Sequence, residues 1–124
     1  VISEDGELNL RKARHPLLEK ALQQFPDTVF VGHSQCFWIE LSGDAPTDIP
    51  GRRKPGSGPV LPGGRLPELL RKYPNLYADL SANSGGQAIL RDPAFGLAFL
   101  EEFSDRLFFA TDMPISAWLF AEFR

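Results

Sequence analysis

The chain has 124 residues, a formal net charge of −3 at pH 7 and a hydrophobic content of 43%, which is ordinary for a globular protein. This acidic balance excludes the strongly basic surface of a nucleic-acid-binding domain, and no apolar run approaches the roughly 20 residues of a membrane span. The single cysteine, Cys36, excludes an internal disulfide and fits a reducing compartment. We therefore predict a cytoplasmic protein with neither nucleic-acid nor membrane partners.

The first predicted unit is a helix followed by a strand. Residues 15–25 (HPLLEKALQQF) place apolar side chains at helical spacing, and Pro16 suits the first turn of a helix. Residues 27–33 (DTVFVGH) form a β-branched and aromatic run that ends in a histidine after a glycine. The pattern predicts a strand that delivers the side chain of His33 at its carboxyl end.

A long proline- and glycine-rich segment follows over residues 42–64, and it predicts a loop rather than a helix or strand. Loops of that length are usually functional or disordered. The segment carries the basic run Arg52, Arg53 and Lys54. We expect this run to be solvated, with attraction of an anionic substrate as the alternative.

Two further units repeat the order of helix, tight turn and strand. The second joins a helix over residues 66–73 to a strand over residues 76–81. The third joins a helix over residues 92–103, capped by Asp92, to a strand over residues 107–111. Strands that alternate with helices do not pair as hairpins, so the three αβ units predict an α/β fold with parallel strands and right-handed crossovers.

The most informative segment is residues 106–114 (RLFFATDMP), where an apolar strand-like run ends in a Thr-Asp pair and is stopped by Pro114. Chemistry in barrels and open parallel sheets gathers at the carboxyl ends of the strands. An aspartate in this place can also simply cap a turn by accepting hydrogen bonds from backbone amides. Because two strands each end in a titratable side chain, we select His33 and Asp112 as candidate catalytic residues.

Three segments resemble the carboxyl-terminal part of the amidohydrolase-related, metal-dependent TIM-barrel hydrolases, a group that also contains zinc-dependent decarboxylases. They are residues 25–33 (FPDTVFVGH), 63–85 (GGRLPELLRKYPNLYADLSANSG) and 91–114 (RDPAFGLAFLEEFSDRLFFATDMP). The resemblance implies a C-terminal fragment of a (β/α)8 TIM barrel, in which the predicted strands are barrel strands six to eight. Residues 1–124 are then a single partial domain.

The same resemblance implies roles for both candidate residues. Asp112 is similar in place to the aspartate that ends the eighth barrel strand, where it binds a divalent metal ion or takes a proton from the metal's water. His33 is similar to the sixth-strand histidine, an acid/base or charge stabiliser near the metal. A metal lowers the pKa of bound water toward neutrality, so a nearby carboxylate and imidazole can move its protons. The implied cofactor is a divalent metal, expected to be zinc, and the implied partner is a small-molecule substrate.

The chain departs from the family in its metal ligands. The family carries a His-x-His pair on its first strand and a histidine on its fifth, whereas the two histidines here are His33 and His15, and we expect His15 to be exposed or to cap a helix. A catalytic zinc normally takes three protein ligands. We therefore expect the last part of a larger hydrolase, truncated at both ends, inactive alone, and cut within a helix that begins near residue 115.

The leading function is hydrolysis of a C–N or C–O bond by the full-length parent, or decarboxylation by the same architecture. A non-catalytic barrel relative or inactive truncated product is the alternative, and a flavodoxin-like module that binds an anion is the third. Cys36 could be a nucleophile but is expected to pack, and residues 83–86 are expected to form a loop that could border substrate. Asp79 and Ser81 share one face of their strand, where one of them could look into the barrel mouth, but we expect a structural hydrogen bond instead. The sequence leaves open whether the chain forms a homo-oligomer.

Overall fold

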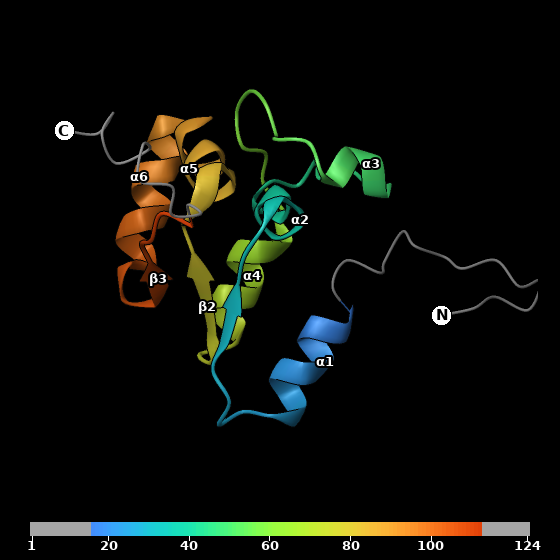
Figure 1. Cartoon of the computed structure of the whole chain (residues 1–124), viewed down its shortest axis with the longest axis vertical. Coiled ribbons are helices and arrows are strands. Elements are labelled where there is room, and N and C mark those ends of the chain that lie inside the picture. The colour runs from blue at the N-terminus through green and yellow to red at the C-terminus, as the bar shows by residue number, and fades with distance from the viewer. Residues whose placement is uncertain (1–15, 113–124) are drawn as a thin grey trace, which may run out of the picture.

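The computed structural model describes residues 16–112 and shows three short parallel strands in one open sheet (Figure 1). The strands are β1 (Phe30–Gly32), β2 (Leu76–Asp79) and β3 (Leu107–Phe108), and they lie in the order β1-β2-β3. In register, Gly32 of β1 lies beside Ala78 of β2, which lies beside Leu107 of β3. The predicted α/β fold with parallel strands is therefore confirmed. His15 and the helix expected to begin near residue 115 lie outside the described residues.

A helix precedes each strand, as the sequence predicts. Helix α1 (Pro16–Gln24) leads into β1, α4 (Arg65–Lys72) leads into β2, and α6 (Pro93–Glu102) leads into β3 through the short 3-10 turn η3 (Ser104–Arg106). The Asp92 carboxylate accepts a hydrogen bond from the Phe95 amide at 3.2 Å, so the predicted cap of α6 is confirmed. None of the helices within residues 16–112 is long and apolar enough to cross a membrane.

The connections hold four further helical segments, namely α2 (Gln35–Trp38), the 3-10 turn η2 (Ile39–Leu41), α3 (Ile49–Arg52) and α5 (Ala82–Leu90). The segment predicted as one loop thus contains α3. The loop predicted over residues 83–86 is wrong, because these residues lie inside α5. Gly85 does not turn the chain there. A Cβ atom on it would lie 2.7 Å from the Leu80 Cα, so glycine lets α5 approach the end of β2.

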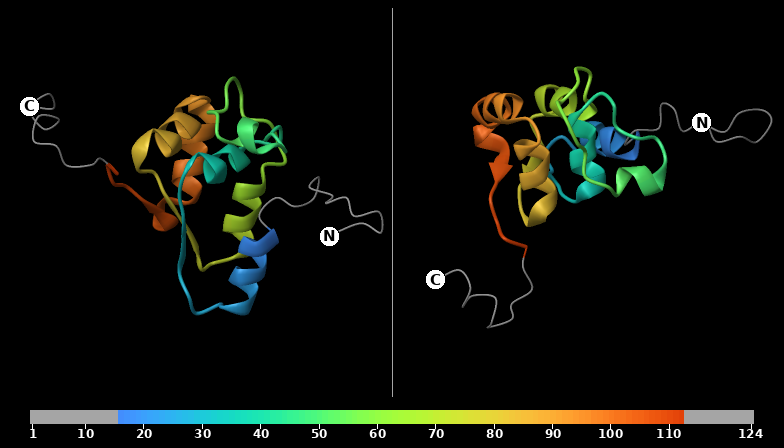
Figure 2. Two further views of the ribbon diagram at one scale, coloured as in Figure 1. Left: turned by 45° about the vertical axis from the view of Figure 1, so that its right-hand side comes forward. Right: turned by 90° about the horizontal axis from the view of Figure 1, so that it is seen from above.

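The core lies between the helices and one face of the sheet. Leu76 and Ala78 of β2 are buried, whereas Val31 of β1 and Phe108 of β3 are exposed on the opposite face. Trp38 of α2 is 1% exposed, and its indole Nε1 donates a hydrogen bond to the Asp79 carbonyl oxygen at 2.9 Å. The packing therefore anchors the carboxyl end of β2, while the segment after β3 extends beyond the helices (Figure 2).

One residue of the basic run is not solvated. Glu40 of η2 is 1% exposed, and its carboxylate forms an ion pair with the Arg52 guanidinium. Arg52 also donates hydrogen bonds to the carbonyl oxygens of Cys36 at 3.1 Å and Pro46 at 3.3 Å. The prediction of a solvated run is therefore wrong for Arg52. A buried carboxylate needs a counter-charge, and the sequence does not tell which basic residue supplies it.

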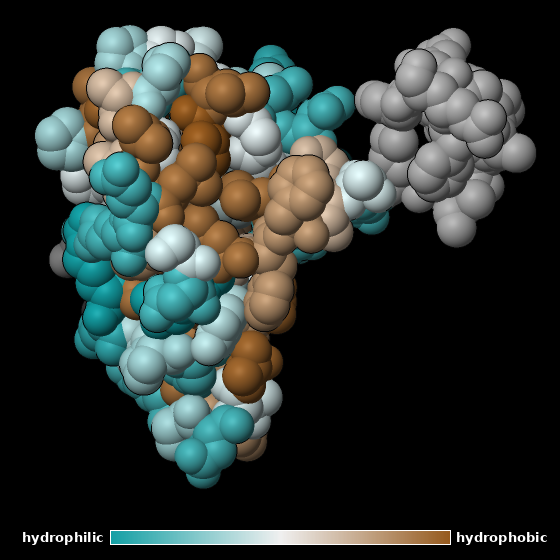
Figure 3. Space-filling model, turned by 90° about the vertical axis from the view of Figure 1, so that its left-hand side faces the viewer, coloured by the Kyte–Doolittle hydropathy of each residue, from teal (hydrophilic) through white to brown (hydrophobic). Residues whose placement is uncertain are grey.

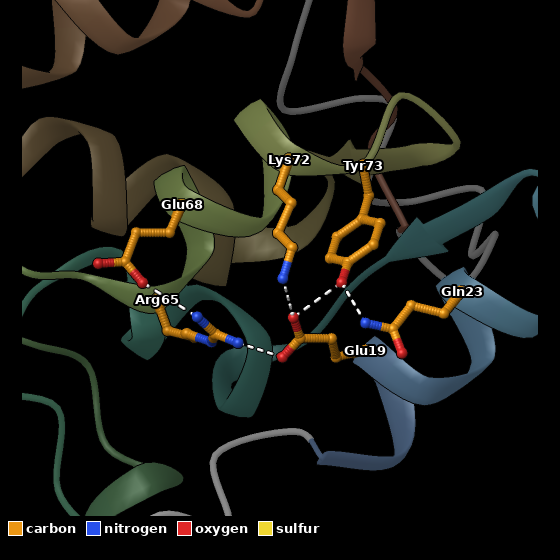
Figure 4. A network of polar contacts seen from close by, with 6 residues as sticks. All are labelled: Glu19, Gln23, Arg65, Glu68, Lys72 and Tyr73. Atoms are coloured by element: carbon orange, nitrogen blue, oxygen red, sulfur yellow. Dashed lines mark hydrogen bonds and ion pairs between the residues drawn. The ribbon is translucent and has the colours of Figure 1, made fainter.

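A polar network around Glu19 joins α1 to α4 (Figure 4). The Glu19 Oε1 accepts hydrogen bonds from the Lys72 ammonium at 2.9 Å and the Tyr73 hydroxyl at 2.8 Å, and the Glu19 Oε2 forms an ion pair with Arg65. The Lys72 and Tyr73 hydrogen bonds and the Arg65 charge outweigh the effect of burial. Together they lower the pKa of the Glu19 carboxyl from 4.5 to about 2.

We expect Glu19→Gln to lower the free energy of unfolding by about 1–2 kcal/mol at neutral pH. Because the folded-state pKa is lowered, ionised Glu19 stabilises the fold above pH 4.5, and this stabilisation is lost as the pH falls from 4.5 to about 2. Urea unfolding across that window should show the difference between wild type and variant shrinking. The control, Glu101→Gln at an exposed position of α6, should show little difference at either pH. A Glu19→Gln effect that does not change with pH would contradict this account.

Candidate active site

The carboxyl ends of the three strands bring together one imidazole and two carboxylates. His33 follows β1, Asp79 ends β2, and Asp112 lies beyond β3. The His33 Nε2 lies 3.2 Å from the Asp112 Oδ2, and the His33 Nδ1 lies 3.2 Å from the Asp79 Oδ2. The structure thus brings the two residues selected from the sequence, His33 and Asp112, into contact, and the imidazole bridges two carboxylates.

The register of the sheet explains this convergence. Gly32 lies beside Ala78, so the next residues, His33 and Asp79, lie side by side and point to the same face. The segment after β3 is held along the end of β2 because the Leu80 amide donates to the Phe108 carbonyl oxygen at 2.8 Å. A second backbone hydrogen bond, at 3.2 Å, joins residues 82 and 111. Asp112 is therefore placed beside His33 across the end of the central strand.

Ser81 fixes the Asp79 carboxylate. The Ser81 backbone amide donates to the Asp79 Oδ1 at 2.8 Å, and the Ser81 hydroxyl donates to the Asp79 Oδ2 at 2.6 Å. The predicted hydrogen bond between these residues is confirmed. Burial raises the pKa of the Asp79 carboxyl, but the hydrogen bonds from Ser81 and the interaction with His33 outweigh it, so the pKa lies below its ordinary value. Sequence reasoning missed the contact of Asp79 with His33, because it depends on the register between β1 and β2.

All three strands are followed by a residue with an unusual backbone. Ser34 has φ 84°, Ala82 has φ 57° and Asp112 has φ 47°, and within residues 16–112 these are the non-glycine residues with positive φ. Aspartate tolerates this region, but Ser34, with ψ 166°, lies in a region used almost solely by glycine. Strained backbone clusters at functional sites, where the surrounding fold holds it in place. Its concentration at the three strand ends marks this edge of the sheet as the candidate site.

We expect Ser34→Gly to raise the free energy of unfolding by about 1 kcal/mol, because glycine adopts the observed backbone without strain. The control is Ser57→Gly, at an exposed loop position without positive φ, where the added freedom of the unfolded chain should lower the stability instead. Denaturant unfolding of both variants measures the contrast. A loss of stability of similar size in both would contradict strain at Ser34.

A cavity of about 400 Å³ lies next to the site. It is formed by the start of α5 and the segment after β3, and its lining is mostly apolar or small: Leu80, Ala82, Asn83, Gly86, Phe109, Ala110, Thr111 and Asp112. The side chains of His33 and Asp112 are 39% and 55% exposed, so both can be reached by a small molecule in or near this cavity. Asn83 and Gly86 belong to the segment that the sequence left open as a border of the substrate site, and both line this cavity.

Asp112 carries the kind of oxygen atom that binds zinc. Zinc takes aspartate oxygen ligands at about 2.0–2.2 Å, so an ion bound by the Asp112 carboxylate would lie close to the His33 Nε2, which is 3.2 Å from the Asp112 Oδ2. The exposed Asp112 carboxylate is free to serve as a ligand on its solvent side. Over residues 16–112, however, no group of three His, Cys, Asp or Glu side chains is arranged to hold a metal ion. Further ligands would have to come from elsewhere.

Cys36 lies in α2, half-buried, close in sequence to His33. The ring nitrogens of His33 face carboxylates, so His33 is not placed to activate the Cys36 thiol.

No protein-family model, curated protein or solved structure matches this chain. The resemblance to the amidohydrolase-related hydrolases thus depends on the matching segments themselves and is carried forward as a proposal.

Proposed function

We propose that the chain belongs to a metal-dependent hydrolase of the amidohydrolase-related kind, in which His33 and Asp112 act on a C–N or C–O bond. The observation that best supports this is the 3.2 Å separation of the His33 Nε2 and the Asp112 Oδ2. These groups come from strands on either side of β2 and meet at the carboxyl edge of a parallel sheet, where enzymes of this architecture place their chemistry. The same architecture carries decarboxylation, which is the alternative reaction.

The two residues have different tasks in this proposal. Asp112 would hold the divalent metal, expected to be zinc, which when bound lowers the pKa of its water toward neutrality. The His33 Nε2 would take up or deliver a proton on a substrate that enters the adjoining cavity. The cavity is mostly apolar, which favours substrate binding with partial exclusion of water. Neither task is complete without ligands from outside residues 16–112.

We further propose that the sheet is the part of a TIM barrel that contains strands six to eight. Parallel sheets are almost always covered on both faces, yet Val31 is 51% and Phe108 49% exposed on the face opposite the helices. Tyr77 lies in register beside Val31, and its ring stacks on that of Phe108 with the ring centroids 5.5 Å apart. Large side chains therefore form a continuous row over all three strands on this face. Apolar surface also forms a band down the side where α6 and β3 lie (Figure 3). Closure of a barrel would cover this face and pair the edges β1 and β3.

Two measurements test the proposed function together. The coding sequence upstream of Val1 should encode a His-x-His at the end of an apolar, strand-like run and a further histidine ligand between that run and this chain. The full-length protein, purified without chelators, should hold about one zinc-like ion per chain by mass spectrometry. A start codon directly before Val1, or a full-length protein without stoichiometric metal, would instead support the non-catalytic alternative.

A further inference from the structure

The surroundings of the His33 Nδ1 consist of hydrogen-bond acceptors. Asp79 Oδ2 lies 3.2 Å from this nitrogen and Ser81 Oγ lies 3.3 Å from it. Ser81 has a single hydroxyl proton, and it is donated to the Asp79 Oδ2 at 2.6 Å. An ionised carboxylate has no proton to give. Both of these oxygen atoms therefore call for a proton on the Nδ1 nitrogen.

The Asp112 carboxylate at the His33 Nε2 competes for the same proton when the imidazole is neutral. Two observations favour Nδ1 in that competition. The Asp79 side chain is 23% exposed and held by both Ser81 hydrogen bonds, whereas the Asp112 side chain is 55% exposed. Water weakens the attraction between exposed charges, so a hydrogen bond from His33 to Asp112 contributes little. The Asp79 carboxylate is partly buried and already fixed by Ser81, so accepting the proton costs no further ordering of that side chain.

We propose that Asp79 and Ser81 are the positioning pair of the site, which holds the neutral His33 imidazole as the Nδ1–H tautomer and leaves Nε2 as its unprotonated nitrogen. Asp79 is itself anchored through its backbone, because the buried Trp38 donates a hydrogen bond to its carbonyl oxygen. A neutral imidazole with a free Nε2 is the form that accepts a proton. The use of that nitrogen in catalysis rests on the proposed function, but the tautomer does not.

Nitrogen-15 NMR of the imidazole ring tests the assignment, since long-range proton–nitrogen correlations distinguish a protonated from an unprotonated ring nitrogen. The His33 signals are those lost in His33→Gln, and spectra are recorded at a pH above which the ring nitrogen shifts no longer change, so that the neutral ring is observed. The wild-type protein is expected to show a protonated Nδ1 and an unprotonated Nε2. A wild-type spectrum with the proton mainly on Nε2 would overturn the proposal without any variant.

The variants separate positioning from general disturbance of the fold. Asp79→Asn should lose the Nδ1–H majority, because an asparagine side chain offers a donor as well as an acceptor. The matched control, Asp112→Asn, should keep the Nδ1–H form, because the carboxylate at the other nitrogen is the one removed. Unchanged His33 signals in Asp79→Asn, or a lost Nδ1–H majority in Asp112→Asn, would contradict the proposal. Ser81→Ala leaves the Asp79 carboxylate with fewer hydrogen bonds, so its ratio of the Nδ1–H to the Nε2–H tautomer should lie between those of the wild type and Asp79→Asn. A tautomer ratio equal to that of the wild type would count against a positioning role for Ser81.

This experiment can fail independently of the proposed function. A protein that binds no metal but keeps His33 as the Nδ1–H tautomer would reject the metal-dependent reaction and leave the positioning pair intact. A protein that binds metal at Asp112 while His33 carries its proton on Nε2 would support the metal-dependent reaction and reject the positioning pair. The two outcomes are therefore distinguished by metal analysis and NMR of the same sample.

Discussion

Asp112→Asn in the full-length protein is expected to lose the bound metal ion and to lower turnover about 100- to 10,000-fold. Asparagine keeps the shape of the side chain but removes the negative charge that a divalent cation requires of a ligand, and it removes the carboxylate that faces the His33 Nε2 at 3.2 Å. Metal content by mass spectrometry and kcat with any substrate that the wild type cleaves are the two measurements.

Two further variants make this result specific. Asp105→Asn, at an exposed position of η3, removes the same charge far from the site and should keep both metal and turnover. His33→Gln should keep the metal while turnover falls, because the imidazole is proposed to move a proton rather than to hold the ion. Retained metal and turnover in Asp112→Asn would reject the role of Asp112.

The second large effect is expected at Arg52, where Arg52→Met should lower the free energy of unfolding by about 3–5 kcal/mol. The variant leaves the Glu40 carboxylate buried without its counter-charge, and Glu40 is 1% exposed. The neighbouring Lys54 provides the control within the same basic run. Lys54→Met, at an exposed position, should change the stability by no more than about 0.5 kcal/mol by denaturant unfolding.

A double variant tests whether the loss at Arg52 comes from the unpaired charge. Arg52→Met combined with Glu40→Leu should recover most of the stability, because replacing both members of a buried ion pair by apolar side chains is often neutral. Within residues 16–112, Glu40 Oε2 is already one of two buried side-chain polar atoms without a hydrogen-bond partner, so the pair is incompletely satisfied in the wild type. A double variant as unstable as the single one would place the effect in packing.

The order of helices and strands could be predicted from the sequence, because apolar spacing and the proline-led helix starts are local signals. Strand lengths could not. The apolar run predicts a third strand over residues 107–111, but the strand pairs only at Leu107–Phe108, since β3 is an edge of the sheet and has one neighbour among the described strands. The sequence does not reveal helix α5, because its glycines also suit a turn, and the close approach of Gly85 to Leu80 that favours glycine there exists only in the folded structure.

The residues of the candidate site also differ in whether the sequence reveals them. His33 and Asp112 could be selected because each stands at the end of a strand-like run, a feature visible along the chain. The role of Asp79 could not, because alternation alone does not tell which face of β2 meets His33. Likewise, Arg52 and Lys54 are similar in sequence context, and only the tertiary position of Glu40 separates the buried residue from the exposed one.

We propose that His33 and Asp112 share one metal-assisted site at the carboxyl edge of a parallel sheet. A crystal structure of the full-length protein grown with zinc, with anomalous diffraction recorded at the zinc edge, tests it most directly. We expect an anomalous peak about 2.0–2.2 Å from an Asp112 carboxylate oxygen, with the His33 imidazole beside it. A peak remote from Asp112, or His33 and Asp112 on opposite ends of the strands, would contradict it.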